Sequence, residues 1–81
     1  MTSRGVGDEV WQTYLRAVAE DTPAEVLVRL ADHKDPGVRR GVAQNPNTPP
    51  EVRTQMVDDE DPYVRLLASM TIRGAGMSRG G

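Results

Sequence analysis

Arginine and aspartate side chains that recur 26 residues apart are the first candidates for chemistry. Asp35 and Arg39 are repeated as Asp61 and Arg65. A planar guanidinium binds phosphate or carboxylate through paired hydrogen bonds, so a row of such arginines could grip an anionic partner. The alternative is a structural ladder within the chain, in which each arginine bonds an aspartate or a carbonyl of the neighbouring repeat. We favour the ladder, because repeated polar residues accompany stacking in repeat proteins.

Two other arginines match under a different shift. Arg16 aligns with Arg40 when the chain is shifted by 24 residues, and the third copy has Leu66 at this position. Both arginines lie outside the repeated Asp–Arg pattern, so we expect them to be exposed. Contact with a partner and a plain solvated surface explain these positions equally well.

Catalytic and metal chemistry has little support in the residue types. The chain has no cysteine and a single histidine, His33, which excludes disulfides, thiol catalysis and cysteine-ligated metal centres. The acidic run at residues 58–61 lacks the spacing and the glycine of a calcium loop, so we expect a solvated loop, with a basic partner segment as the alternative. We predict no enzyme activity, no metal site and no cofactor.

The charge distribution argues against a general nucleic-acid binder. Residues 8–72 hold all twelve acidic residues against seven basic ones, within a chain of net charge −2. Phosphate backbones favour basic surfaces. No apolar run approaches the ~18 residues of a membrane span, and residues 1–7 lack a signal-peptide core. We expect a cytoplasmic protein, or part of an assembly built inside a bacterial cell.

The elements that would position these side chains are repeated. Residues 22–44 overlie residues 48–70 with nine identities in 23 positions, where about one or two would arise by chance. A period of this length is typical of a stacked solenoid. Glycines concentrate at the two ends of the chain, which predicts three segments: a flexible arm at 1–7, a repeat domain at 8–72 and a flexible Gly/Arg-rich tail at 73–81.

Helix-start signals recur in the same register. Thr22 with Glu25, and Thr48 with Glu51, have the spacing of a capping box, with proline directly after each threonine. In a capping box the threonine oxygen accepts from the backbone N–H three residues on, and the glutamate reaches back to the threonine N–H. We therefore predict helix caps at these four residues.

Further signals complete an all-α prediction. Asp35 and Asp61 each precede a proline, which marks two more helix starts, and Asn45 before Pro46 marks a helix end. No segment alternates with the period of a strand. Apolar residues at helical spacing predict five short helices, some of which could be 3₁₀ segments, at about 8–20, 23–32, 36–44, 49–58 and 62–72.

The order of these motifs resembles the leucine-rich repeat variant. Residues 35–39 are Asp-Pro-Gly-Val-Arg, residues 42–51 are Val-Ala-Gln-Asn-Pro-Asn-Thr-Pro-Pro-Glu, and residues 58–65 end in Asp-Pro-Tyr-Val-Arg. The resemblance implies a HEAT-like bacterial fold, a short right-handed α-solenoid of about two and a half repeats in this chain. It also implies a binding scaffold whose partners vary. The chain departs from the family in having no cysteine cluster and in replacing leucines by valine and methionine.

Large side chains lie at both ends of the expected stack. Trp11 and Tyr14 are expected to form a hydrophobic plug at its start. Tyr63, Leu66 and Met70 fall on one face of the last helix, at repeat positions that are small or polar in the preceding copy, namely Gly37, Arg40 and Gln44. We interpret them as a surface for a partner or for a second copy of the chain.

These features predict a non-enzymatic interaction module or structural accessory subunit. It would dock on a larger protein assembly, of which a virion shell is one example, through a protein partner or self-association. The alternative is a HEAT-like nucleic-acid-binding module that uses its arginines. The acidic body disfavours that alternative.

Overall fold

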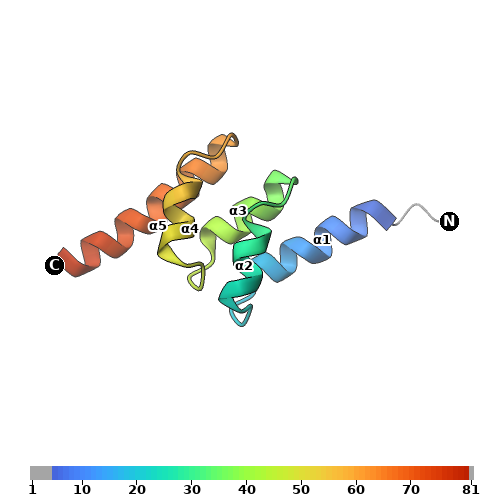
Figure 1. Ribbon diagram of the computed structural model, residues 1–81, viewed down its shortest axis with the longest axis horizontal. Helices are drawn as coiled ribbons and strands as arrows, with labels where there is room; N and C mark the ends of the chain where they lie inside the picture. The colour runs from blue at the N-terminus through green and yellow to red at the C-terminus, as the bar shows by residue number, and fades with distance from the viewer. Residues whose placement is uncertain (1–4, 81) are drawn as a thin grey trace.

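Five α-helices form the part of the chain that the structure describes. The structure is a computed structural model that describes the backbone of residues 5–80 and the side chains of residues 9–71. Within that range there is no strand and no 3₁₀ segment, which confirms the all-α prediction. The helices are α1 (Gly5–Val18), α2 (Ala24–Leu30), α3 (Pro36–Gln44), α4 (Pro50–Met56) and α5 (Pro62–Gly80) (Figure 1).

The outer helices are longer than the sequence predicts. Helix α1 begins at Gly5, and α5 continues to Gly80, through most of the predicted tail. A glycine inside a helix costs only about 1 kcal/mol relative to alanine, and extending a helix is easier than nucleating one. The remaining parts of the predicted arm and tail, residues 1–4 and 81, lie outside the described residues.

The odd-numbered helices form a row. Helix α1 packs against α3, and α3 packs against α5, while α2 contacts α3 and α4 contacts α5. Figure 1 shows α1, α3 and α5 running in a similar direction, with α2 and α4 crossing the row and the termini at opposite ends. The molecule is correspondingly elongated, at 54 × 26 × 16 Å. This arrangement agrees with a short helical repeat; its right-handed sense stays a prediction.

The hydrogen bonds between successive helices extend the 26-residue register over the whole row. The Thr22 hydroxyl donates to the Arg16 carbonyl at 2.6 Å, and 26 residues later the Thr48 hydroxyl donates to the Val42 carbonyl at 2.8 Å. Arg16 therefore corresponds to Val42. The predicted alignment of Arg16 with Arg40 is wrong, because it rested on a short local match. The residue in register with Arg40 is Tyr14.

The same two bonds overturn the predicted capping boxes. Helices α2 and α4 have Pro23 and Pro49 at their N-caps, with no side-chain hydrogen bond there. The hydroxyls of Thr22 and Thr48 point backward instead. Each satisfies a carbonyl at the end of the preceding helix, which has no partner within that helix. Glu25 and Glu51, the other members of the predicted boxes, are exposed.

The remaining boundary signals act as predicted. The Asp35 carboxylate accepts from the Val38 N–H at 3.2 Å, and the Asp61 carboxylate accepts from the Val64 N–H at 3.0 Å. Asn45 is the C-cap of α3, with an extended ψ of 124°. These signals succeed because caps and Asn-Pro steps depend on only a few neighbouring residues.

A narrow core lies between the row and the crossing helices. The buried apolar residues are Ala17, Leu27, Val38, Val42, Ala43, Val52, Met56, Val64 and Ala68. Trp11 is not among them: 58% of it is exposed, whereas Tyr14 is half-buried against the core. The predicted plug is thus wrong for Trp11, since α1 has a row neighbour on one side only. No helix in the described range is long and apolar enough to cross a membrane.

Candidate functional site

An ion pair joins α3 to the loop that precedes α5. The Arg39 guanidinium donates to both carboxylate oxygens of Asp59, at 2.9 and 3.0 Å, and to the carbonyls of His33 and Lys34, at 2.8 and 3.1 Å. Arg39 is 8% exposed, so its charge is neutralised where little water reaches it. The Asp59 carboxylate raises the pKa of Arg39 above its already high value.

Arg65 repeats only half of this arrangement. It donates to the carbonyls of Asp59 and Glu60, at 2.8 and 3.2 Å, which are the equivalents of His33 and Lys34. Its side chain is exposed and forms no ion pair with any of the side chains described.

The acid in this contact is therefore Asp59, and neither Asp35 nor Asp61 bonds Arg39 or Arg65. The two predicted ladder acids are occupied at the starts of α3 and α5. Asp59 belongs to the acidic run, so that run is more than a solvated loop.

Arg40 is also engaged within the chain. Its guanidinium donates to both carboxylate oxygens of Asp61 at 3.0 Å, and its central carbon lies 4.7 Å from the centre of the Tyr63 ring. The hydrogen bond from Arg40 lowers the pKa of Asp61 to about 2, with a further contribution from the Val64 N–H. Arg40 keeps 39% of its side chain exposed, so the predicted exposure is present only in part, because the stacking offset brings the start of α5 beneath the guanidinium.

Arg16, the other arginine of that expectation, is exposed. It lies in an open groove between α1 and α2, which Glu9 and Arg29 also line. Among the described residues, no carboxylate forms an ion pair with the Arg16 guanidinium.

Asn45 has a second role that sequence reasoning missed. Its buried side-chain amide donates to the carbonyls of Ala17 and Ala19, at 2.7 and 2.9 Å, and accepts from the Asn47 N–H at 2.9 Å. The Thr71 hydroxyl, 26 residues later, lies 3.2 Å from the Ala43 carbonyl and 2.8 Å from the Leu67 carbonyl of its own helix, and its single proton is shared between them. Asn45 thus fastens α3 firmly to the end of α1, whereas Thr71 holds α5 to α3 only weakly. A clue in the sequence was an amide side chain next to a helix-ending proline.

Arg53 is a buried cation that pairs with no acid among the side chains of residues 9–71. Its guanidinium donates to the Asn45 carbonyl at 2.8 Å, while its Nε has no hydrogen-bond partner among the residues described. Leu27 occupies the equivalent position of α2. Burial accordingly lowers the pKa of Arg53.

Exposed apolar side chains gather on the last helix of the row. Tyr63, Leu66 and Met70 are 58%, 53% and 58% exposed, and we call these three residues the α5 patch. On the opposite side of α5, Val64 and Ala68 are buried against the preceding repeat. Both faces lie where the sequence predicts them.

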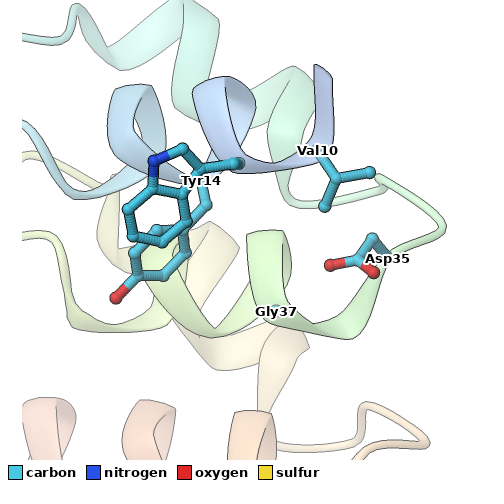
Figure 2. Close-up of a pocket in the computed structure, with 5 residues that line it drawn as sticks. Val10, Tyr14, Asp35 and Gly37 are labelled. Atoms are coloured by element: carbon cyan, nitrogen blue, oxygen red, sulfur yellow. The ribbon is translucent and has the colours of Figure 1, made fainter. Parts of the chain in front are cut away.

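A hollow of about 500 Å³ lies at the other end of the row, between α1 and the start of α3. Figure 2 shows Val10 and Tyr14 on α1 facing Asp35 and Gly37. The Trp11 and Tyr14 rings stack there, with centroids 5.6 Å apart. In the 26-residue register Gly37 is the equivalent of Tyr63, so the hollow marks the place that a tyrosine ring fills one repeat later.

The loop that contains His33 holds a local hydrogen bond. In the described range, no three His, Cys, Asp or Glu side chains converge as metal ligands would. His33 Nδ1 accepts from the Asp35 N–H at 3.1 Å, where the equivalent Asp59 carboxylate accepts from the Asp61 N–H at 2.8 Å. This shared bond gives His33 a local structural contact in its loop.

Comparison with known protein families gives one match. The family model described as leucine rich repeat variant matches residues 36–61, which run from the first residue of α3 through α4 to the cap of α5. The resemblance predicted from the motifs is confirmed over that span. Neither the curated proteins nor the solved structures contain a match to this chain.

Proposed function

We propose that this chain, whose residues 36–61 match the leucine rich repeat variant, is a non-enzymatic interaction module. It docks on a larger protein assembly through the α5 patch. The observation that carries this proposal is the exposure of three large apolar side chains on one helical face. Single exposed apolar residues are ordinary on protein surfaces, whereas a contiguous group marks an interaction site.

The spacing and support of the α5 patch suit a flat or grooved protein surface. Its residues are separated by three and four positions, so they point from successive turns of one helix. Tyr63 is also held in place by Arg40, which reduces the side-chain freedom that binding would remove. Burying each of these side chains would contribute about 1.5–3 kcal/mol before the cost of association.

The ion pairs that the α3 arginines form within the chain favour a protein partner over a nucleic acid. Arg39 and Arg40, the two adjacent cations of α3, are neutralised by Asp59 and Asp61. A phosphate would have to displace carboxylates that already form two hydrogen bonds to each guanidinium.

The test is recovery of the partner assembly by a variant that changes only the α5 patch. Leu66→Gln combined with Met70→Gln should keep its helical circular dichroism and lose most of the assembly that co-purifies with the parent chain. The matched control is Val28→Gln on α2, an exposed apolar residue outside the patch, which should recover the assembly normally. Equal recovery by all three proteins, with folds intact, would place the docking surface elsewhere.

A further inference from the structure

The contact between α3 and α5 has an upstream half and a downstream half. The upstream helix, α3, supplies two cations, Arg39 and Arg40, and Arg40 also lies over an aromatic ring. The downstream segment supplies Asp59, Asp61 and the ring of Tyr63. Because the register is 26 residues, each half has an equivalent elsewhere in the chain.

An upstream half is exposed at the C-terminal end of the row. Arg65 is the equivalent of Arg39, and Leu66 is the equivalent of Arg40. Met70 is the equivalent of Gln44 and of Val18, whose Cγ1 lies 3.0 Å from the position a Cβ on Gly41 would take. These three residues, Arg65, Leu66 and Met70, form what we call the C-terminal end face, and all of them are exposed.

A downstream half is exposed at the N-terminal end. Glu9 is the equivalent of Asp61, Trp11 of Tyr63, and Leu15 of Leu67 and Gly41. We call Glu9, Trp11 and Leu15 the N-terminal end face. Each of them is exposed, Trp11 by 58% and Leu15 by 45%.

We propose that copies of this chain associate head to tail, with the C-terminal end face of one copy seated on the N-terminal end face of the next. This inference rests on the proposed function and names a second copy of the chain as a partner of α5. In the register of the internal contact, Leu66 meets Trp11 of the next copy, as Arg40 meets Tyr63. The Trp11 ring stacks on Tyr14, and the residue remains 58% exposed to receive Leu66. Met70 then lies beside Leu15.

The charges match in the same direction as inside the chain. Upstream Arg39 and Arg40 meet downstream acids in the internal contact. At the ends, the upstream face carries Arg65 and the downstream face carries Glu9. An inverted, two-fold contact between two C-terminal end faces would instead bring two Arg65 cations together, which disfavours it.

The contact between copies lacks two bonds that the internal contact has. Ala19 stands at the position of Asn45 and Thr71, and its side chain has no donor for a carbonyl of the preceding helix. Gly7 stands at the position of Asp59, so Arg65 has only Glu9 to meet. The association is therefore weaker than the internal packing and reversible with concentration. Because such a contact joins different surfaces, it produces open chains of copies.

Two complementary variants test the proposal by analytical ultracentrifugation of the full chain. Leu66→Gln with Met70→Gln disables one end face, and Trp11→Gln with Leu15→Gln disables the other. Each variant alone should be monomeric, with a dissociation constant raised at least about tenfold over the parent. Mixed together, they should form one-to-one dimers and nothing longer, because each retains the face that the other lacks.

Three results would overturn the head-to-tail contact. They are a parent chain that stays monomeric at every concentration tested, a mixture that stays monomeric, and self-association by the Trp11→Gln/Leu15→Gln variant alone. If that variant loses its helical circular dichroism, Glu9→Arg takes its place, since it changes an exposed polar side chain. The proposed function fails separately, when the Leu66→Gln/Met70→Gln variant still recovers the partner assembly.

Discussion

The two contacts along the row share a register and differ in chemistry. Between α3 and α5, two arginines meet two aspartates. Between α1 and α3, the positions of Arg39 and Arg40 hold Thr13 and Tyr14, and the helices approach closely at Gly41. Both contacts keep a side chain at one position, Asn45 or Thr71, within hydrogen-bond distance of a carbonyl of the preceding helix. The Thr71 hydroxyl divides its proton between that carbonyl and Leu67 of its own helix. Bonds to the backbone thus maintain the repeat, while the side chains around them are free to diverge.

The largest expected loss of stability comes from removing the Asn45 side chain, which bonds α3 to the end of α1. Asn45→Ala should lower the free energy of unfolding by about 3 kcal/mol, since the Ala17 carbonyl and the Asn47 N–H lose their side-chain partner at a buried site. The Ala19 carbonyl would keep only the Thr22 N–H, at 3.4 Å. Urea denaturation measures the change. Thr71→Ala, the matched change at the second contact, should cost about 1 kcal/mol, because the Thr71 hydroxyl is only half-buried and lies closer to the Leu67 carbonyl of its own helix than to Ala43. Equal losses of stability in Asn45→Ala and Thr71→Ala would contradict the stronger bonding at the contact between α1 and α3.

Next comes the comparison of the two equivalent arginines. Arg39→Ala should destabilise the fold by about 2 kcal/mol, because two carbonyls lose their donor and the Asp59 carboxylate keeps only the Asp61 N–H. Arg65→Ala removes an exposed side chain and should stay within about 0.5 kcal/mol of the parent. Thermal unfolding of both variants at neutral pH separates the two values. A larger loss for Arg65 would contradict the assignment of the ion pair to the internal contact.

The close approach of α1 and α3 predicts a smaller effect. A Cβ on Gly41 would lie 2.9 Å from the Ala17 Cβ and 3.0 Å from a Val18 methyl, so Gly41→Ala should cost about 1 kcal/mol after its gain in helix propensity. Gly37→Ala is the control. Its Cβ would crowd only an Asp35 carboxylate oxygen, at 2.9 Å, and a side-chain carboxylate can shift. Denaturation midpoints that fall equally for both would argue against a tight contact at Gly41.

The last comparison concerns pH at the second contact. Binding to Arg40 lowers the pKa of Asp61 from 3.8 to about 2 in the folded chain. This carboxylate therefore adds stability above about pH 4, and the contribution disappears as pH falls toward 2. Arg40→Ala should raise the pKa of Asp61 toward its ordinary value, as followed by carbon NMR of the side-chain carboxyl. Arg16→Ala should leave that titration unchanged, and an unmoved Asp61 pKa in Arg40→Ala would contradict the pairing.

Sequence reasoning succeeded where the determinants are local. The caps at Asp35 and Asp61 and the helix end at Asn45 each depend on a proline or an N–H within three residues. The exposure of the α5 patch was also predictable, because residues at helical spacing share a face and a polar-to-apolar change stands out against the repeat.

The contacts between repeats could not be read in the same way. Arg39 meets Asp59, and Arg40 meets Asp61, across 20 and 21 residues. Those partners depend on the offset between stacked helices, which residue spacing does not specify. The direction of the Thr22 and Thr48 hydroxyls also depended on a carbonyl six residues upstream. The threonine hydroxyl can either cap the next helix or donate to that carbonyl, and the sequence alone does not decide between the two bonds.

One measurement tests most directly whether the outer face of α5 is covered when the chain binds its partner. The chain has no cysteine, so Ser69→Cys places a single near-isosteric thiol between Leu66 and Met70. Thr54→Cys on α4 is the control. Alkylation of Cys at position 69 should be at least about tenfold slower in the recovered complex than in the dilute isolated chain, as expected for a buried interface, with position 54 unchanged. Equal rates at position 69 in both states would contradict the account.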